Sequence, residues 1–143
     1  MPTRISIACA CLALACMPAA LPAQAAVSGA GASSVAVRIA PHRTAINADG
    51  TVEVVMRIQC KDGYNVFEID TSVVQPDAQG SSTEIGPFLA PCDGKKHRRV
   101  VEVAPSSGTF HLGAATLSVF VGVFDGRSDL QATDEVTVRL YAR

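Results

Sequence analysis

Cysteine has the most reactive side chain in this 143-residue sequence, and it occurs five times. Cys9, Cys11 and Cys16 lie in an apolar N-terminal segment, so only Cys60 and Cys92 remain in the rest of the chain. If the chain is exported, two remaining cysteines favour a single disulfide bond. A pair of free, buried thiols is the alternative.

Histidine is the other side chain that often binds metal ions at neutral pH. A zinc or copper site needs two or three ligands that converge. However, His42, His97 and His111 occur singly, without an H-x-H or H-x-x-x-H spacing. Met56 is the only methionine beyond the N-terminal segment. We therefore expect ordinary surface or loop histidines and no metal site.

The sequence shows no arrangement typical of catalysis. It has no G-x-S-x-G nucleophile motif and no glycine-rich phosphate-binding loop. Its 13 acidic residues fall on the outer faces of expected strands and in turns, which does not favour a catalytic pair of carboxylates. We expect a protein that is not an enzyme and that needs no cofactor.

Residues 95–99 form the one cluster of charge, with five consecutive cationic or potentially cationic side chains. Such a run can attract an anionic polymer, phosphate groups or an acidic protein. Successive strand residues point to opposite faces, so one surface cannot present all five. The alternative is a solvated strand start whose charges protect a sheet edge from aggregation.

The overall composition excludes several classes of protein. The chain has 12 Lys and Arg, 13 Asp and Glu, and a net charge of −1, which gives no general attraction to nucleic acid or acidic membranes. Its hydrophobic content of 48% is too high for a disordered chain. The length fits one small domain.

Residues 1–25 have the three parts of a secretory signal peptide. Arg4 precedes the apolar run of residues 5–17, and a small-x-small sequence at 23–25 predicts cleavage after Ala25. The run, expected to be helical, is shorter than the roughly 20 residues of a membrane span, and no later stretch is long and apolar enough. We expect a secreted or periplasmic protein. The alternative is a lipoprotein signal in which Cys16 is acylated.

Alternating apolar and polar positions dominate the rest of the chain. Residues 26–34 are mainly Ala, Gly and Ser, which predicts a flexible lead-in. From residue 35 to residue 143 the period-2 pattern predicts about seven short strands, with turn signals between them and no helix. The expected strands cover residues 35–39, 51–60, 66–74, a short edge strand within 83–89, 97–103, 114–124 and 136–141.

We expect these strands to form an antiparallel Ig-like β-sandwich, because that is the usual arrangement of such a pattern. In Ig-like wiring the second and fifth strands are antiparallel neighbours. Cys60 at the end of one then lies near Cys92 in the turn before the other, so a bridge is geometrically reasonable. The predicted core contains Val52, Val54, Met56, Ile58, Phe67, Ile69, Val101, Val103, Leu117, Val119, Val121, Val136, Val138 and Leu140.

Loops at one end of this sandwich gather several polar side chains, and such loops often bind ligands. Asp62 and Asp93 lie there beside Tyr64, Lys95 and Lys96. We select Tyr64, Lys95 and Lys96 as candidate ligand-binding residues for an anionic or polar envelope component. The alternative is that Tyr64 only packs over the disulfide bond.

Four short motifs also carry a family resemblance. They are Ile58-Gln59-Cys60, Val73-Val74-Gln75, Cys92-Asp93-Gly94 followed by His97, and Phe110-x-x-Gly113-x-Ala115. Together they resemble small exported bacterial β-sandwich domains of unknown function, over roughly residues 35–138. The resemblance implies the fold and the Cys60–Cys92 bridge, and it implies no activity.

A weaker resemblance concerns the segment Lys61-Asp62-Gly63-Tyr64-x-Val66-Phe67. It is similar to the Gly-Tyr segment after the second strand in the N-terminal domain of the periplasmic disulfide-reductant transporter family. The activity of that domain needs a close pair of redox cysteines late in the chain. This sequence has no such pair after Cys92.

Taken together, the sequence predicts an exported, non-enzymatic binding or structural module of the bacterial cell envelope. We expect a monomer that binds an envelope component or protein, without nucleic acid and without a membrane span. One alternative is a periplasmic redox or metal-handling protein. Another is an envelope assembly subunit, which the alternating strand at 136–141 suggests.

Overall fold

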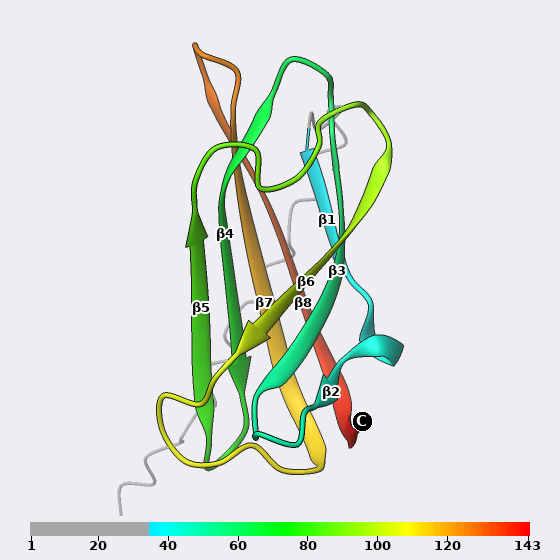
Figure 1. Ribbon diagram of the computed structural model, residues 1–143, viewed down its shortest axis with the longest axis vertical. Coiled ribbons are helices and arrows are strands. Elements are labelled where there is room, and N and C mark those ends of the chain that lie inside the picture. The colour runs from blue at the N-terminus through cyan, green and yellow to red at the C-terminus, as the bar shows by residue number, and fades with distance from the viewer. Residues whose placement is uncertain (1–34) are drawn as a thin grey trace, which may run out of the picture. The chain divides into compact units, whose positions relative to one another are not determined.

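Strands make up nearly all of the regular structure in the computed structural model, which describes residues 35–143 (Figure 1). The expected signal peptide at 1–25, the lead-in at 26–34 and the alternative acylation of Cys16 lie outside the described residues. The described part belongs to one compact unit. Its elements are β1 (Val35–Ile39), the short 3-10 helix η1 (Pro41–Arg43), β2 (Ala45–Ile46), β3 (Val52–Cys60), β4 (Asn65–Val74), β5 (Gln79–Ile85), β6 (Lys96–Val103), β7 (Gly113–Phe124) and β8 (Asp129–Ala142).

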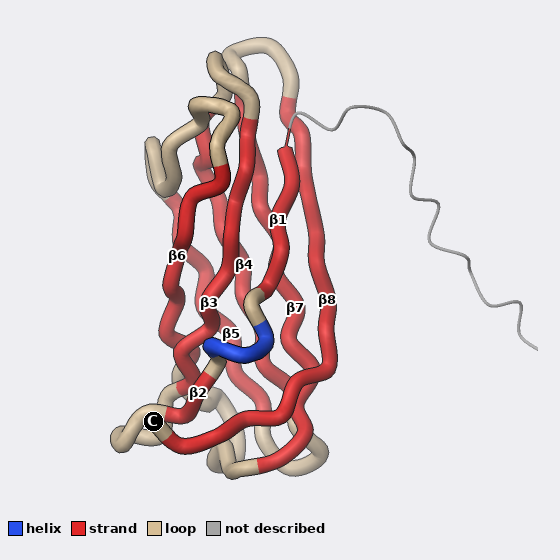
Figure 2. The backbone as a smooth tube through the Cα atoms, turned by 90° about the vertical axis from the view of Figure 1, so that its right-hand side faces the viewer, coloured by secondary structure: helices blue, strands red, loops and turns tan. Residues whose placement is uncertain are grey.

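Hydrogen bonds join the eight strands into one mixed sheet. The strand order is β1-β3-β2-β8-β7-β4-β5, and β6 pairs with β3 off this path. All neighbours are antiparallel except β2 and β8, which are parallel. The sheet folds over, so that β1, β3 and β6 form a first layer and β4, β5, β7 and β8 form a second layer behind it (Figure 2). Apolar side chains of both layers fill the space between them.

The alternation of side chains predicts most of these strands. The strands at 35–39, 51–60, 66–74, 97–103 and 114–124 are confirmed to within one residue at each end. The predicted edge strand within 83–89 is wrong in position, because β5 begins at Gln79 and ends at Ile85. The last strand is much longer than predicted. The sequence pattern also misses β2 and η1, both of which are very short.

The predicted core is largely confirmed. Alternate residues of β3 face inward, and Val52, Val54, Met56 and Ile58 are fully buried. Twelve of the fourteen predicted residues are buried, and the other eight are Ile69, Val101, Val103, Leu117, Val119, Val121, Val138 and Leu140.

Phe67 and Val136 are the two exceptions to the core prediction. The register of β4 against β7 shifts between Val66 and Glu68, which leaves Phe67 as an extra residue in a β-bulge. Val66 is therefore buried, while the Phe67 ring lies against Gly122, where an added Cβ would come within 3.1 Å of Phe67 Cζ. Val136 is only partly buried, because β8 has β7 as its one hydrogen-bonded neighbour at this position, and β2 pairs with β8 only at Tyr141 and Ala142.

A buried glutamine fixes the long loop between β6 and β7. The amide nitrogen of Gln75 donates hydrogen bonds to the carbonyl oxygens of His111 (2.9 Å) and Ala114 (3.2 Å), and its Oε1 accepts one from the His111 backbone N–H (3.1 Å). Phe110 in this loop is buried, as expected for a residue that closes the end of the core, whereas Leu112 is exposed.

In the part of the chain that the structure describes, no helix has the length and apolar character to cross a membrane.

Candidate functional site

Three arginines lie side by side across the outer surface of the first layer. The antiparallel register places Arg38 of β1 opposite Arg57 of β3, and Arg57 opposite Arg98 of β6. Opposite residues of neighbouring strands have Cβ atoms about 4.5–5.5 Å apart. All three residues are exposed. Strand pairing thus gathers three cations into one row from positions that are distant in the sequence.

A second row lies next to the first on the same strands. It consists of Ala36 of β1, Gln59 of β3 and Lys96 of β6, again as direct partners. Ala36, Gln59 and Lys96 join Arg38 and Arg57 in lining a shallow depression of about 150 Å³. The depression is bordered by three cations and one amide, with no acidic side chain in its lining. We call this surface the arginine face and define it by Arg38, Arg57, Gln59, Lys96 and Arg98.

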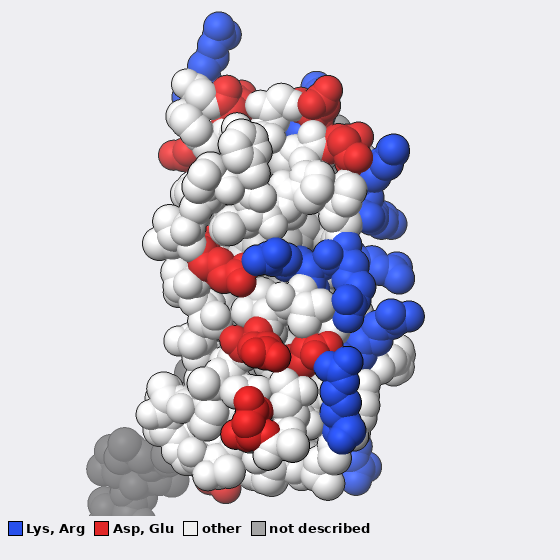
Figure 3. All heavy atoms as spheres, in the orientation of Figure 1, with Lys and Arg blue, Asp and Glu red and all other residues white. Residues whose placement is uncertain are grey.

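Strand alternation holds the cationic side chains outward. On β3, Met56 and Ile58 flank Arg57 and are fully buried. On β1, Val37 and Ile39 flank Arg38 in the same way. Because successive side chains of a strand point to opposite faces, burial of these neighbours directs both arginines to solvent. Figure 3 shows most of the visible Lys and Arg side chains on the right-hand half of the view, where Figure 1 draws β1 and β3.

Acidic residues compensate the outer arginines but not the centre of the face. Arg38 Nη1 lies 3.1 Å from Asp134 Oδ1, and Asp134 Oδ2 accepts a hydrogen bond from the Ile39 backbone N–H (2.8 Å). Arg98 Nη2 lies 3.9 Å from Glu53 Oε1. Within residues 35–143, no ion pair involves Arg57 or Lys96. The uncompensated positive charge therefore lies around the depression.

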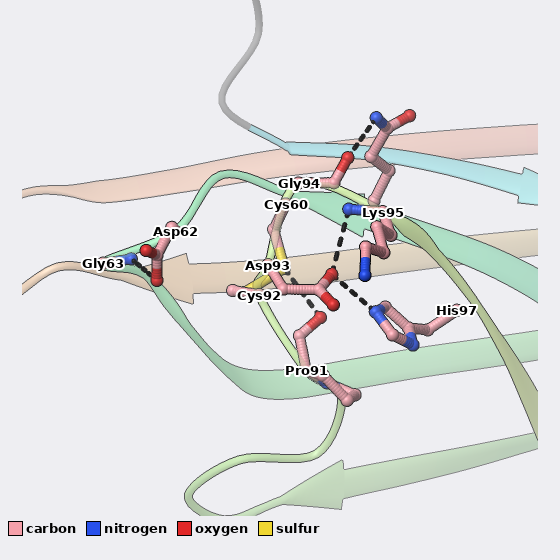
Figure 4. The surroundings of a disulfide bond; sticks show 10 residues. Cys60, Asp62, Gly63, Pro91, Cys92, Asp93, Gly94, Lys95 and His97 are labelled. Atoms are coloured by element: carbon pink, nitrogen blue, oxygen red, sulfur yellow. Dashed lines mark hydrogen bonds and ion pairs between the residues drawn. A yellow bond between two sulfur atoms is a disulfide. The ribbon is translucent and has the colours of Figure 1, made fainter.

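The disulfide bond closes the end of the first layer next to this face. Cys60 at the end of β3 is bonded to Cys92, with their Cα atoms 4.7 Å apart, which confirms the predicted bridge (Figure 4). The Gly94 backbone N–H donates to the Cys60 carbonyl oxygen (2.9 Å), and Gln59 Nε2 donates to the Gly94 carbonyl oxygen (2.7 Å). The turn that leads into β6 is thus fixed to the end of β3, and Gln59 is held in place beside Lys96.

Asp93 organises the same turn (Figure 4). Its Oδ1 lies 2.7 Å from His97 Nε2 and accepts a hydrogen bond from the Lys95 backbone N–H (2.9 Å). The hydrogen bond with His97, followed by that from Lys95, lowers the pKa of Asp93 below its usual value of 3.8. The contact between Asp93 and His97 therefore has a structural role, because it fixes the turn at the start of β6.

The structure separates the three predicted binding residues. Lys96 lines the depression of the arginine face. Lys95 is exposed in the turn before β6, and its backbone N–H donates a hydrogen bond to Asp93 Oδ1. Tyr64 is partly buried and packs against the core.

Arg38 and Arg57 are functional candidates that the sequence reasoning missed. Each is a single cation whose neighbours in the sequence are uncharged, so neither belongs to a cluster of charge in the sequence. Alternation does place Arg57 on the outer face of β3. Only the register between strands shows that Arg38, Arg57 and Arg98 are neighbours, and no sequence pattern specified that register.

The histidines lie at separate places. His42 is in η1, where its carbonyl oxygen accepts a hydrogen bond from the Tyr141 hydroxyl (2.8 Å). His111 lies in the loop between β6 and β7, where its Nδ1 is 3.6 Å from Asp77 Oδ1, whereas His97 lies in β6. Among residues 35–143, no three His, Cys, Asp or Glu side chains form a group that could hold a metal ion.

Comparison with protein families identifies a match that covers most of the chain. A model described as a family of unknown function matches residues 33–137, which include every residue of the arginine face and both cysteines. A search of curated proteins finds no match to the chain.

Proposed function

The chain belongs to this family, DUF6299, and we propose that it is an exported, non-enzymatic module that binds an anionic component of the bacterial cell envelope on its arginine face. The observation that carries this proposal is the register that aligns Arg38, Arg57 and Arg98. Like charges directly opposite each other destabilise a sheet. A bound anion would offset that repulsion, because it attracts each of the arginines.

The chemistry of the face favours a ligand with several negative groups. A guanidinium presents a planar set of donors that matches phosphate or carboxylate oxygens. Arg57 and Lys96 have no ion pair within the described residues, so their charge is available to such a ligand. The row crosses three strands, which suits a polymer with repeated anionic groups better than a single small ion.

The strand arrangement supports an Ig-like β-sandwich. The first layer contains β1, β3 and β6, which correspond to the first, second and fifth strands of Ig-like wiring. The second layer contains β4, β5, β7 and β8. As that wiring requires, β3 and β6 are antiparallel partners. A rigid sandwich of this kind can hold charged side chains in a fixed row.

Export is part of the proposal. The sequence of residues 1–25 has the features of a signal peptide. The disulfide between Cys60 and Cys92 supports export, because such bonds persist in oxidising compartments. Sequencing the N-terminus of the protein from culture medium and periplasm should give Ala26 as the first residue. A first residue of Cys16 with an attached lipid would contradict cleavage after Ala25.

Binding can be tested by sedimentation with purified envelope fragments. We expect the wild-type protein to sediment with the fragments at low salt and to be released as salt rises, because salt screens exposed charges. A variant with Arg57→Gln and Lys96→Gln should stay in solution. The matched control is Arg127→Gln together with Lys61→Gln, which removes the same charge from exposed turn positions. Equal sedimentation of both variants would contradict the proposal.

The alternative redox function requires a disulfide bond that another thiol can reach. A redox-active bond must be accessible to a thiol, but Cys60 is only 1% exposed, so attack would have to occur at the partly buried Cys92. Mass spectrometry after digestion without reductant distinguishes a redox protein from a binding module. A bond that resists mild reductant favours the binding module, and a labile bond or a bound metal favours the redox or metal-handling protein.

A further inference from the structure

A second hollow lies on the outer surface of the other layer. It has a volume of about 440 Å³ and is lined by residues of β4, β5, β7 and β8. The register places Thr83 of β5, Asp70 of β4, Phe120 of β7 and Thr133 of β8 in one row across its floor. We call this hollow the hydroxyl groove.

The adjacent row adds more hydrogen-bonding groups. Ser72 of β4, Ser118 of β7 and Glu135 of β8 are direct partners there. The Ser118 hydroxyl donates to Glu135 Oε2 (2.9 Å). No lysine or arginine lines the groove. The groove therefore has the opposite character to the arginine face: hydroxyls and carboxylates, with one aromatic ring among them.

Two residues that line the groove each have a buried side-chain oxygen without a hydrogen-bond partner in the described part of the chain: Oδ1 of Asp70 and Oγ1 of Thr71. Asp70 is the one that lies in the row across the floor of the groove. Buried polar atoms almost always have a partner, and an unpaired one requires an explanation. The Asp70 oxygen is covered in the structure, so the side chain would have to rotate for a donor from a ligand in the groove to supply the missing bond.

We propose that the hydroxyl groove binds an uncharged saccharide. Sugar hydroxyls both donate and accept hydrogen bonds, so they match serine and threonine hydroxyls as well as the carboxylates of Asp70 and Glu135. The Phe120 ring offers an apolar surface to the C–H face of a sugar ring. Ligand sites commonly combine such an apolar surface with a few placed polar groups. An ammonium ligand fits less well, because it only donates and would leave the hydroxyl hydrogens without acceptors.

The test uses cellohexaose, chitohexaose and xylohexaose as neutral probes and spermine as a cationic probe, each titrated into the protein by calorimetry. We expect at least one oligosaccharide to bind, with an affinity that changes little between low and high salt. Asp70→Asn and Phe120→Ala should each weaken that binding about tenfold, in the range of a lost hydrogen bond to a charged group or a lost aromatic contact. The control is Phe88→Ala, which removes an exposed ring outside the groove.

The outcomes separate this proposal from the binding of anions. Saccharide binding that survives Arg57→Gln shows that the groove acts independently of the arginine face. Binding of spermine alone would overturn the saccharide assignment, as would the absence of binding by any of the three oligosaccharides. Equal affinity in the wild type and in Asp70→Asn would also overturn it, because this nearly isosteric variant keeps the shape of the groove.

Discussion

Arg57 of β3 and Arg98 of β6 are direct partners in the antiparallel register of their strands. Both are exposed, and Arg57 also faces Arg38 on its other side. Hydrophobic burial of the alternate positions excludes a shift of this register by one residue, because such a shift would turn Met56 and Ile58 to solvent. The core thus holds the arginines together against their mutual repulsion.

Removal of the central arginine should therefore stabilise the free protein. We expect Arg57→Gln to raise the free energy of unfolding at low salt by a few tenths of a kcal/mol up to about 1 kcal/mol, the range for pairs across strands. The gain should shrink at high salt, since salt screens the repulsion that is being removed. Urea unfolding at two salt concentrations measures both effects. A loss of stability at low salt would show that the arginines do not repel each other.

The disulfide bond should contribute much of the stability of the domain. It joins positions 32 residues apart in the sequence. Replacing both Cys60 and Cys92 with Ala is expected to lower the free energy of unfolding by about 2–4 kcal/mol, without a change of fold. Chemical unfolding measures the loss, and the far-ultraviolet spectrum checks the fold. An unchanged free energy of unfolding would contradict the structural role.

Acid should destabilise the protein partly through its turns. Hydrogen bonds lower the pKa of Asp49, Asp93 and Asp125 below the usual 3.8, from Thr51, His97 and Ser128 respectively as the largest causes. A carboxyl group whose pKa is lower in the folded state stabilises that state above pH 3.8. This stabilisation is lost as the pH falls from 3.8 through the folded-state values. Asp93→Asn should flatten the loss of stability in acid, and an unchanged pH profile would show that these bonds do not form.

A tight backbone contact gives a test of the packing around β5. A Cβ on Gly80 would lie 2.2 Å from the Ala104 carbonyl oxygen, which belongs to the backbone and cannot move aside easily. We expect Gly80→Ala to lower the free energy of unfolding by about 1–3 kcal/mol, as overpacked sites do. The matched control is Gly86→Ala, because a Cβ there would meet only Leu89 Cδ2 at 3.7 Å. Equal effects of the two substitutions on thermal unfolding would contradict the described contact.

Sequence and structure agree where a local pattern decides the outcome. Alternation in β3 predicts that Met56 is buried and Arg57 exposed, because successive side chains point to opposite faces of the strand and the apolar face packs against the core. Phe67 shows where the pattern fails. A single extra residue reverses the faces on one side of the bulge, and nothing in the local sequence marks the position of that extra residue.

The binding surfaces depend on contacts that the sequence does not specify. The sequence groups Tyr64, Lys95 and Lys96 as candidate binding residues because their loops are expected to meet at one end of the sandwich. Of these three residues, Lys96 alone lines the depression. Which residues of β1, β3 and β6 lie opposite each other depends on strand register, so the row formed by Arg38, Arg57 and Arg98 follows only from the folded chain.

Calorimetric titration with inorganic polyphosphate tests the central proposal most directly, because the probe carries nothing but repeated anionic groups. The experiment compares the wild type with Arg57→Gln and with the control Arg127→Gln, all at the same low salt concentration. We predict that Arg57→Gln weakens binding about three- to tenfold, as expected for the loss of a charge-assisted contact at an exposed site. Arg127→Gln should bind like the wild type. Equal affinities of the wild type and Arg57→Gln would contradict the assignment of the arginine face as the anion-binding site.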